Sequence, residues 1–333
     1  MTSPKITVFM AAYNAEDYIS ASIKSVLNQT FSDFELLIVN DGSTDKTVDV
    51  IEQFDDKRIR LVHNEQNLGL TFTRNRLLEL DTAELIAILD SDDLAHPNRL
   101  EHQYRFFKEN PAVALCGGHA KVIDENGSYT GLQYIEPTDD SISIFMLFGN
   151  PFINSATMFK RTIFTALGGY RDFAPAEDFD LFVRISRQWK IANIDKFLVD
   201  YRIHLNNSSV SGITAQQKNE KLILESMQER LGMETSRESV DLHFDLFKRV
   251  YKLELTPGYL NFLIDLKSSN LKTQIYPKKD FEYFLFQKAF EIIQANKNQR
   301  KALYFYFNSG LFAWKYFQLK QFKRCLKRSL FGF

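Results

Sequence analysis

Three aspartates that follow one apolar segment are the residues of this chain with the clearest chemical potential. Residues 85–93 read Leu-Ile-Ala-Ile-Leu-Asp-Ser-Asp-Asp, so Asp90, Asp92 and Asp93 come directly after a run that fits a buried strand. Clustered carboxylates repel one another, and a hard cation such as Mg²⁺ or Mn²⁺ removes this repulsion and can also bind a diphosphate. The segment therefore predicts a metal and diphosphate site. A solvated acidic turn before Pro97 is the alternative.

Two earlier apolar segments also end in polar residues. Ala12, Tyr13 and Asn14 follow the first of them, and Asp41 and Asp45 follow the second. Open α/β sheets bind their ligands at the carboxyl ends of their strands, so we expect these residues to lie near the aspartates at 90–93. A simpler function for Asp41 and Asp45 is to cap the helix that comes after them.

Two common nucleotide-binding motifs are absent from the sequence. The first turn lacks the GxGxxG fingerprint of dinucleotide-binding enzymes, and no P-loop motif of the form GxxxxGK followed by Ser or Thr occurs. The remaining option is a nucleotide that is held by carboxylates, an aromatic side chain and a metal ion.

The first 117 residues alternate between strand and helix patterns, which predicts an α/β fold with a doubly wound, mainly parallel sheet. Strands are expected at 6–11, 34–39, 59–63, 85–89 and 113–116. Helices are expected at 14–28, from a cap at 43 or 44 to 54, after Gly69 to Leu80, and at 97–110. In the first of these helices, Asn14 has the position of the N-cap.

The pattern is looser after residue 117. Asn126-Gly127 predicts a hairpin between strands at 121–124 and 128–134. Helices are expected at 139–148, 161–168 and 178–188, and extended segments at 156–159 and 191–199. Helical patterns dominate from residue 214, so we predict an α/β domain at 1–212 and a helical region at 213–333.

The overall composition is that of an ordinary globular protein, with 44% hydrophobic and 25% charged residues and a net charge of −1. The two cysteines, Cys116 and Cys325, are far apart in the sequence, which argues against a disulfide framework and a zinc site. The sequence has no signal-peptide pattern at its start and no uncharged run near the ~20 residues that a membrane-spanning helix needs. We therefore expect a cytoplasmic protein.

Taken together, the motifs resemble those of inverting glycosyltransferases of family 2, which have the GT-A fold. The order and spacing of the motifs are similar to the family over roughly residues 4–210. The segments that carry the resemblance are Ala12-Tyr13-Asn14, Val39-Asn40-Asp41-Gly42-Ser43-Thr44-Asp45, Asn67-Leu68-Gly69, Thr73-Arg74-Asn75, Asp90-Ser91-Asp92-Asp93, Glu177-Asp178 and Tyr201-Arg202-Ile203-His204. One departure is Ala11, which stands where the family often has proline.

The resemblance implies a nucleotide-sugar donor, with a UDP-sugar favoured. Asp41 would accept the uracil N–H, Tyr13 would form a wall of the base pocket, Asp90 would contact the ribose, and Arg74 would face the diphosphate. The full set of implied donor-binding residues is Ala12, Tyr13, Asn14, Asp41, Asn67, Arg74, Asp90, Ser91 and Asp92.

The resemblance also implies a divalent metal cofactor, Mn²⁺ or Mg²⁺, with Asp92 and His204 as ligands. Glu177 and Asp178 would form the catalytic pair on the acceptor side, with Asp178 as the general base for a single in-line displacement that inverts the anomeric carbon. Considered without the resemblance, Glu177-Asp178 is the acidic first turn of a helix and His204 a structural histidine.

Two other activities compete with this interpretation. A nucleotidyltransferase of similar fold also uses a carboxylate-bound metal, but it would need a glycine-rich loop near the amino terminus, where Ala11 and Ala12 stand. The second alternative is a catalytically inactive module that binds a sugar nucleotide.

The last part of the chain is basic and aromatic. No acidic residue follows Glu291, whereas nine basic residues do. They are Lys297, Arg300, Lys301, Lys315, Lys320, Lys323, Arg324, Lys327 and Arg328. Basic residues interleaved with aromatic ones suit an anionic membrane surface, which would bring a glycan or lipid-linked acceptor at the inner face of the cell membrane within reach. An aromatic core with a basic solvated face is the equal alternative, and nucleic-acid binding is disfavoured because no known motif occurs.

Overall fold

A computed structural model describes residues 3–135, 139–205, 213–295 and 300–331. The chain divides into two compact units, which are described separately. Residues 1–143 and 150–219 form the first unit, and residues 144–149 and 220–333 form the second. The division at 219/220 falls within helix α10 (Ile213–Arg230), and residue 212, at the predicted boundary, lies outside the described residues.

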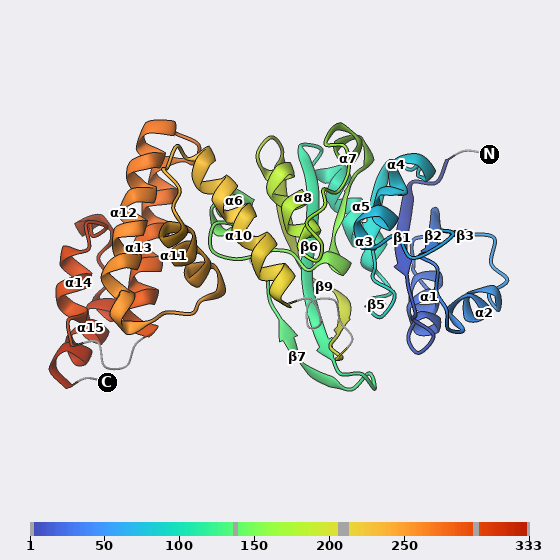
Figure 1. Ribbon diagram of the computed structural model, residues 1–333, viewed down its shortest axis with the longest axis horizontal. Helices are drawn as coiled ribbons and strands as arrows, with labels where there is room; N and C mark the ends of the chain where they lie inside the picture. The colour runs from blue at the N-terminus through green and yellow to red at the C-terminus, as the bar shows by residue number, and fades with distance from the viewer. Residues whose placement is uncertain (1–2, 136–138, 206–212, 296–299, 332–333) are drawn as a thin grey trace. The chain divides into compact units, whose positions relative to one another are not determined.

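The first unit is built on a sheet of nine strands among the described residues (Figure 1). The strands are β1 (Ile6–Ala12), β2 (Phe34–Asn40), β3 (Ile59–His63), β4 (Leu85–Ile88), β5 (Leu94–Ala95), β6 (Val113–Ile123), β7 (Tyr129–Gln133), β8 (Met158–Lys160) and β9 (Lys190–Arg202). Their order is β3-β2-β1-β4-β8-β6-β9-β5, and β7 pairs with β6. The predicted α/β class and its helical carboxy-terminal region are confirmed.

Parallel pairing brings the carboxyl ends of the early strands together. β1 runs parallel to both β2 and β4, and β2 runs parallel to β3. In this register Ala12 lies opposite Asn40, and Phe9 lies opposite Ile88. The residues that follow β1, β2 and β4 therefore start from one edge of the sheet, as predicted. Beyond β4 the sheet is mixed, because β8 is antiparallel to both β4 and β6, while β6 and β9 are parallel.

The helices of the first unit are short. They are α1 (Ile19–Leu27), α2 (Thr47–Glu52), α3 (Leu70–Asn75), α4 (Leu77–Leu80), α5 (Arg99–Glu109), α6 (Asp139–Phe145), α7 (Arg161–Ala166) and α8 (Glu177–Ser186), with a 3₁₀ turn η1 (Asn154–Ala156). The last two residues of α6 already belong to the second unit. The predicted helix that ends at Leu80 is two helices, with Arg76 between them.

The predicted capping function of Asn14 is wrong. Helix α1 begins at Ile19 without a side-chain cap, and Asn14 lies in an earlier turn with φ of +47°. Its Oδ1 instead accepts a hydrogen bond from the backbone N–H of Thr44, 2.9 Å away. The turn after β1 is therefore held by the turn after β2, and the helix starts only beyond it.

Strand β6 is longer than expected. It joins the predicted segments 113–116 and 121–124 into one strand, because β9 pairs with it along nearly its whole length. The predicted hairpin to β7 is present. The two-residue strand β5 was not predicted.

The second unit is helical, as predicted. Its elements after α10 are α11 (Arg237–Lys248), η2 (Leu253–Leu255), α12 (Thr256–Thr273), α13 (Lys278–Ala295), α14 (Ala302–Asn308), η3 (Trp314–Tyr316) and α15 (Leu319–Phe331). Phe286, Tyr306 and Tyr316 form a buried aromatic cluster with Cys325. Many of the late aromatic residues thus fill a core, as one alternative held. No helix among the described residues is long and apolar enough to cross a membrane.

Residues 144–149 belong to the helical unit although they lie early in the sequence. The Leu147 carbonyl accepts a hydrogen bond from His243 Nε2 at 2.7 Å, and the Phe148 ring stacks on Phe284 with centroids 5.5 Å apart. Burial lowers the pKa of His243 to about 4, so this histidine is neutral. The predicted division at 212/213 did not foresee this excursion of the chain.

Candidate active site

The turns after β1 and β2 are joined by hydrogen bonds. Besides the bond from Thr44 to Asn14, the Asn14 N–H donates to Ser43 Oγ at 3.0 Å. The Asp41 N–H donates to the carbonyl of Ala12 at 2.8 Å. Tyr13, which stands between these contacts in the sequence, is 48% exposed. The structure thus brings the turn at 12–14 against the turn that follows Asp41, and the ring of Tyr13 is half-exposed.

Asp41 is the centre of a polar cluster and is only 4% exposed. Its Oδ1 accepts from Asn64 Nδ2 at 2.8 Å and from the Leu68 N–H at 2.9 Å, and its Oδ2 accepts from the Gly69 N–H at 3.0 Å. Asn67, another predicted donor residue, caps the same Gly69 N–H through its Oδ1 at 3.0 Å. Since a carboxylate offers about four acceptor positions, Asp41 can accept one more hydrogen bond.

Gly42 allows the loop at 66–69 to approach the end of β2 closely. Its φ is +69°, and a Cβ atom there would lie 2.6 Å from the carbonyl carbon of Gln66. Any other residue at this position would push the loop away and would also adopt a strained backbone conformation.

Arg74 bridges two predicted parts of the site. Its Nη2 contacts Asp90 Oδ1 at 2.9 Å, its Nη1 donates to Glu177 Oε1, and the side chain is buried. The adjacent Thr73 accepts a hydrogen bond from Asn64 Nδ2, the group that also binds Asp41. The guanidinium group thus lies between two carboxylates, and the expected contact of Arg74 with a diphosphate stays a prediction.

Asp90 is held by two residues that the sequence analysis missed. Asn154 Nδ2 lies 3.2 and 3.1 Å from its two carboxylate oxygens, and Ser155 Oγ donates to Oδ2 at 3.0 Å. Both residues lie in η1, directly before β8. Their only signal in the sequence is a polar pair that follows an apolar Phe152-Ile153. Ser91, a predicted donor residue, has its carbonyl bound to Ser22 Oγ at 2.8 Å.

The other two aspartates after β4 differ in their contacts. Asp92 Oδ2 lies 2.9 Å from His204 Nε2, so the predicted metal ligands are adjacent. Burial and the charge of Asp90 raise the pKa of Asp92, and His204 opposes that rise. Asp93 is fully buried and accepts the backbone N–H of Arg202 at 2.7 Å, which ties the end of β4 to β9.

The Asp92–His204 pair is small for a metal site. No group of three or more His, Cys, Asp or Glu side chains that could hold a metal ion occurs among the described residues. A cation at this pair would therefore need oxygen ligands from a bound substrate or water. The donor set still fits Mg²⁺ or Mn²⁺, since such ions are commonly held by one or two carboxylates together with substrate phosphates.

Glu177 and Asp178 lie in the first turn of α8, as predicted. Glu177 is buried against Arg74, whereas Asp178 is partly exposed. Burial raises the pKa of Asp178 to about 7, the charge of Glu177 adds to this rise, and Arg74 opposes it. A partly exposed carboxyl with a pKa near neutrality is suited to accept a proton from a bound hydroxyl.

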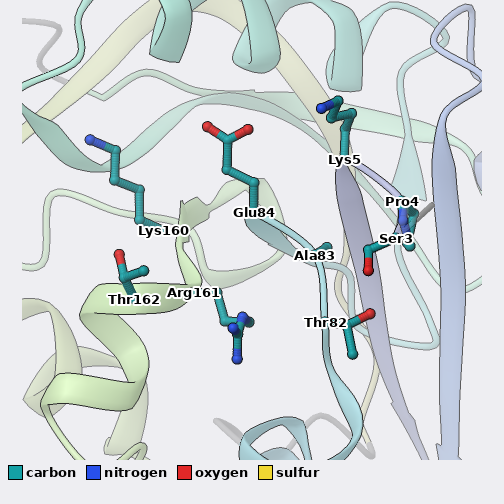
Figure 2. A pocket seen from close by; sticks show the side chains of 9 residues that line it. All are labelled: Ser3, Pro4, Lys5, Thr82, Ala83, Glu84, Lys160, Arg161 and Thr162. Carbon is teal, nitrogen blue, oxygen red and sulfur yellow. The ribbon is translucent and has the colours of Figure 1, made fainter.

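A hollow of about 460 Å³ lies at the opposite edge of the sheet (Figure 2). Lys5 and Glu84 come just before β1 and β4, so this hollow is at the amino ends of those strands. None of the predicted site residues lines it.

Comparison with known proteins places the chain among glycosyltransferases. Residues 7–167 match the model of the family described as glycosyl transferase family 2. An uncharacterized glycosyltransferase of Haemophilus influenzae is 34% identical over 218 residues, which are 62% of this chain and 68% of the relative. The UDP-Glc:alpha-D-GlcNAc-diphosphoundecaprenol beta-1,3-glucosyltransferase WfgD of Escherichia coli is 33% identical over 207 residues, 62% of this chain and 79% of that protein.

Solved structures show the same fold at low sequence identity. S. aureus TarS 1-349 in complex with UDP-GlcNAc has a TM-score of 0.57 and 18% identity, with 98% of this chain and 92% of that chain covered. The mannosyltransferase PcManGT from Pyrobaculum calidifontis, in complex with GDP-Man and Mn²⁺, has a TM-score of 0.54 and 14% identity, with 99% and 88% covered. The predicted resemblance is therefore confirmed: the chain belongs to glycosyl transferase family 2 and is a sugar-transferring enzyme.

Proposed function

We propose that this protein is a metal-dependent, inverting glycosyltransferase that uses a UDP-sugar. The observation that carries the proposal is two sets of polar contacts at the carboxyl edge of the sheet, which neighbouring residues of α3 bring together. Asn64 joins Asp41 to Thr73, and the next residue in the chain, Arg74, joins Asp90 to Glu177. The predicted donor side and the predicted acceptor side are thus parts of one site.

The donor would bind along the first half of this set. Asp41 has one free acceptor position for the uracil N–H, and the half-exposed ring of Tyr13 can pack on the base. The names of two compared proteins support UDP, since WfgD is named for UDP-Glc and TarS was solved with UDP-GlcNAc. Asp90 remains the candidate for the ribose contact.

Asp92 and His204 would hold the divalent cation. Their 2.9 Å contact leaves most of the coordination sphere to the diphosphate of the donor, as is usual for Mg²⁺. When bound, the ion would neutralise the charge that develops on the leaving diphosphate. The Mn²⁺ in the PcManGT complex supports the use of a divalent cation.

Asp178 would be the general base, and Glu177 would not. Glu177 is buried and engaged by Arg74, so it cannot reach an acceptor, whereas Asp178 is partly exposed. Asp178 would take the proton of the acceptor hydroxyl as its oxygen attacks the anomeric carbon from the face opposite the diphosphate. One displacement of this kind inverts that carbon.

The acceptor would be a glycan or a lipid-linked sugar in surface polysaccharide or lipopolysaccharide synthesis. The name of WfgD, with its diphosphoundecaprenol-linked acceptor, supports this class. With a lipid-linked acceptor of this kind, the enzyme would act at the inner face of the cell membrane. Helix α15 fits it, because Lys320, Lys323 and Arg324 are exposed on it and make no ion pair with any described residue. Trp314, nearby in the sequence, is 78% exposed.

The membrane contact is tested by flotation with anionic liposomes at low and high salt. We expect the full-length protein to float at low salt only, since each cation near an anionic surface contributes about 1 kcal/mol. Charge reversal at Lys320, Lys323 and Arg324 should abolish flotation. The same reversal at three exposed lysines of α12 and α13, Lys272, Lys278 and Lys279, is the matched control. Equal loss in both variants, or no flotation of the natural chain, would contradict the contact.

The activity is tested by screening nucleotide sugars with Mn²⁺ by thermal shift, followed by donor hydrolysis and transfer assays. We expect a UDP-sugar to raise the melting temperature and to be hydrolysed, and EDTA to stop both. Asp92→Asn should lose most activity and keep its fold. Asp195→Asn is the control, because Asp195 also pairs with a histidine, His119 at 3.0 Å, but outside the site. Full activity in EDTA or in Asp92→Asn would exclude the metal, and binding without turnover would indicate an inactive module.

A further inference from the structure

A turn between α7 and α8 is held from the side of α3. Asn75 Oδ1 accepts the Tyr170 N–H at 2.8 Å, and Asn75 Nδ2 donates to the Tyr170 carbonyl at 2.9 Å. Gly169 has a φ of +77°, and a Cβ atom there would lie 2.4 Å from Asn75 Oδ1. The close approach of Asn75 to this turn therefore requires glycine at position 169.

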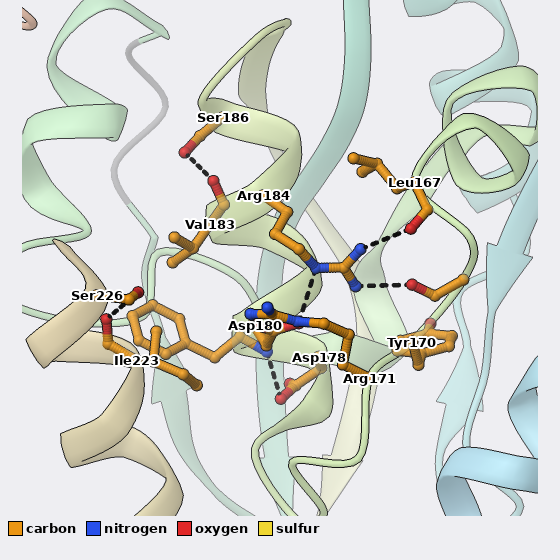
Figure 3. A network of polar contacts seen from close by, with 12 residues as sticks. Leu167, Tyr170, Arg171, Asp178, Asp180, Val183, Arg184, Ser186, Ile223 and Ser226 are labelled. Atoms are coloured by element: carbon orange, nitrogen blue, oxygen red, sulfur yellow. Dashed lines mark hydrogen bonds and ion pairs between the residues drawn. The ribbon is translucent and has the colours of Figure 1, made fainter. Parts of the chain in front are cut away.

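The same turn is held from the side of α8 by Arg184 (Figure 3). Its Nη1 donates to the Leu167 carbonyl at 3.1 Å and its Nη2 to the Gly169 carbonyl at 2.7 Å. Its Nε donates to Asp180 Oδ2 at 2.8 Å. Asp180 is buried and also binds the half-exposed Arg171, so the arginine that reaches the turn has a fixed partner on its own helix.

These contacts close a ring that includes Arg74 and Glu177. Asn75 follows Arg74 on α3, and Arg74 binds Glu177 at the start of α8. Arg184, one to two turns later on α8, binds the turn that Asn75 holds. Helices α3 and α8 are therefore linked twice, once directly by the Arg74–Glu177 ion pair and once through the turn at 167–170.

We propose that Arg184 is a positioning residue, which holds the turn at 167–170 against Asn75 and so fixes the guanidinium group of Arg74 between Glu177 and Asp90. The inference rests on the proposed function of Asp178 as the base. The guanidinium–Tyr170 ring distance of 5.7 Å shows that the held turn also packs on Arg74 itself.

The position of Arg74 matters because of the charges that face Asp178. The negative charges of Glu177 and Asp90 favour the protonated form of Asp178, and Arg74 is the cation that favours its ionised form. The buried Tyr170 is also close enough to Arg74 and Asp178 to interact with their charges. If Arg74 moves away, Asp178 keeps its proton to a higher pH and fewer enzyme molecules have a working base. Arg184 would thus act on the base without touching the substrate.

The test compares Arg184→Lys with Arg171→Gln in the full-length protein. Lysine keeps a positive charge, but its single nitrogen cannot replace the three guanidinium nitrogens that bind Asp180 and the two carbonyls separately. Arg171→Gln removes the other cation on Asp180, and the Arg171 side chain makes none of the hydrogen bonds that hold the turn. We expect the acid limb of kcat/KM to move to higher pH by roughly half a unit or more in Arg184→Lys, with the KM for the donor nearly unchanged. Arg171→Gln should leave the limb in place.

If Arg184→Lys folds and the acid limb of its kcat/KM profile does not move, the inference is overturned. Arg184 would then have a structural function only. If that variant does not fold, Asn75→Ala breaks the ring from the other side and should move the limb in the same direction. Failure of the proposed function is distinguishable, because it would appear as full transfer activity in Asp178→Asn, whatever the profile of Arg184→Lys.

Discussion

The substitution Glu177→Gln should let the enzyme work at a lower pH. Burial is the largest cause of the raised pKa of Asp178, and the charge of Glu177 is the second largest. The base must be ionised to act. Activity therefore rises as the pH passes through about 7, the pKa of Asp178. Glutamine removes the charge but keeps an oxygen that can accept the hydrogen bond from Arg74, so the site should retain its shape.

The size of the shift follows from the charges around Asp178. At an effective dielectric constant near 20, a unit charge a few ångströms away is worth roughly 2–4 kcal/mol, and one pKa unit corresponds to about 1.4 kcal/mol. Arg74 already neutralises part of the Glu177 charge. We therefore expect the pKa of Asp178 to fall by about one unit. At pH 6 the ionised fraction of Asp178, and with it the fraction of plateau activity, would then be about 5-fold larger in the variant than in the natural enzyme.

The assay is kcat/KM for sugar transfer between pH 5 and 9, at saturating Mn²⁺ and with a thermal melt at each pH. Loss of one partner of the buried Arg74 will lower the melting temperature, so the profile is read only where the variant is folded. Asp172→Asn, which removes an exposed carboxylate near the same helix, is the control and should not shift the limb. A limb that stays in place, or moves to higher pH, would show that Asp178 is not the titrating base.

Two further predictions concern the base and the donor loop. Asp178→Asn should keep donor affinity and slow transfer by about 10²–10⁴-fold, the usual contribution of a positioned base, and a collapse of UDP affinity with normal turnover would reassign Asp178 to the donor site. Gly42→Ala should weaken UDP binding and lower the melting temperature more than Gly69→Ala does, because both glycines have positive φ but only the Cβ at 42 meets backbone, at Gln66. Calorimetric titration with UDP and thermal melts measure both effects, and equal effects of the two substitutions would refute the steric argument.

The parts of the site that could be predicted are those that local pattern determines. An apolar run followed by polar residues marks a buried strand and its carboxyl end, which is why the ends of β1, β2 and β4 were placed correctly around Asp41 and Asp90. Parallel pairing then brings these ends together without any further information.

The parts that could not be predicted depend on partners far apart in the sequence. Asn14 has the local pattern of a helix cap, but its side chain binds Thr44 across two strands. Asn154 and Ser155 hold Asp90 from more than sixty positions away, and Arg74 lies between carboxylates on two different elements. Periodicity carries no signal for such contacts, because it reports only how one element faces the core.

The excursion of residues 144–149 limits which parts of this chain can finish folding while the chain is being synthesised. Leu147 and Phe148 leave the first unit early, but their partners His243 and Phe284 are made about 100 and about 140 residues later. Until then two fully buried apolar side chains have no core to enter. For the same reason, the helical unit cannot be exchanged with that of a relative by a single cut after residue 219. A hybrid enzyme would also need a matching segment at 144–149, or it would expose Phe148 and leave the Leu147 carbonyl without its histidine.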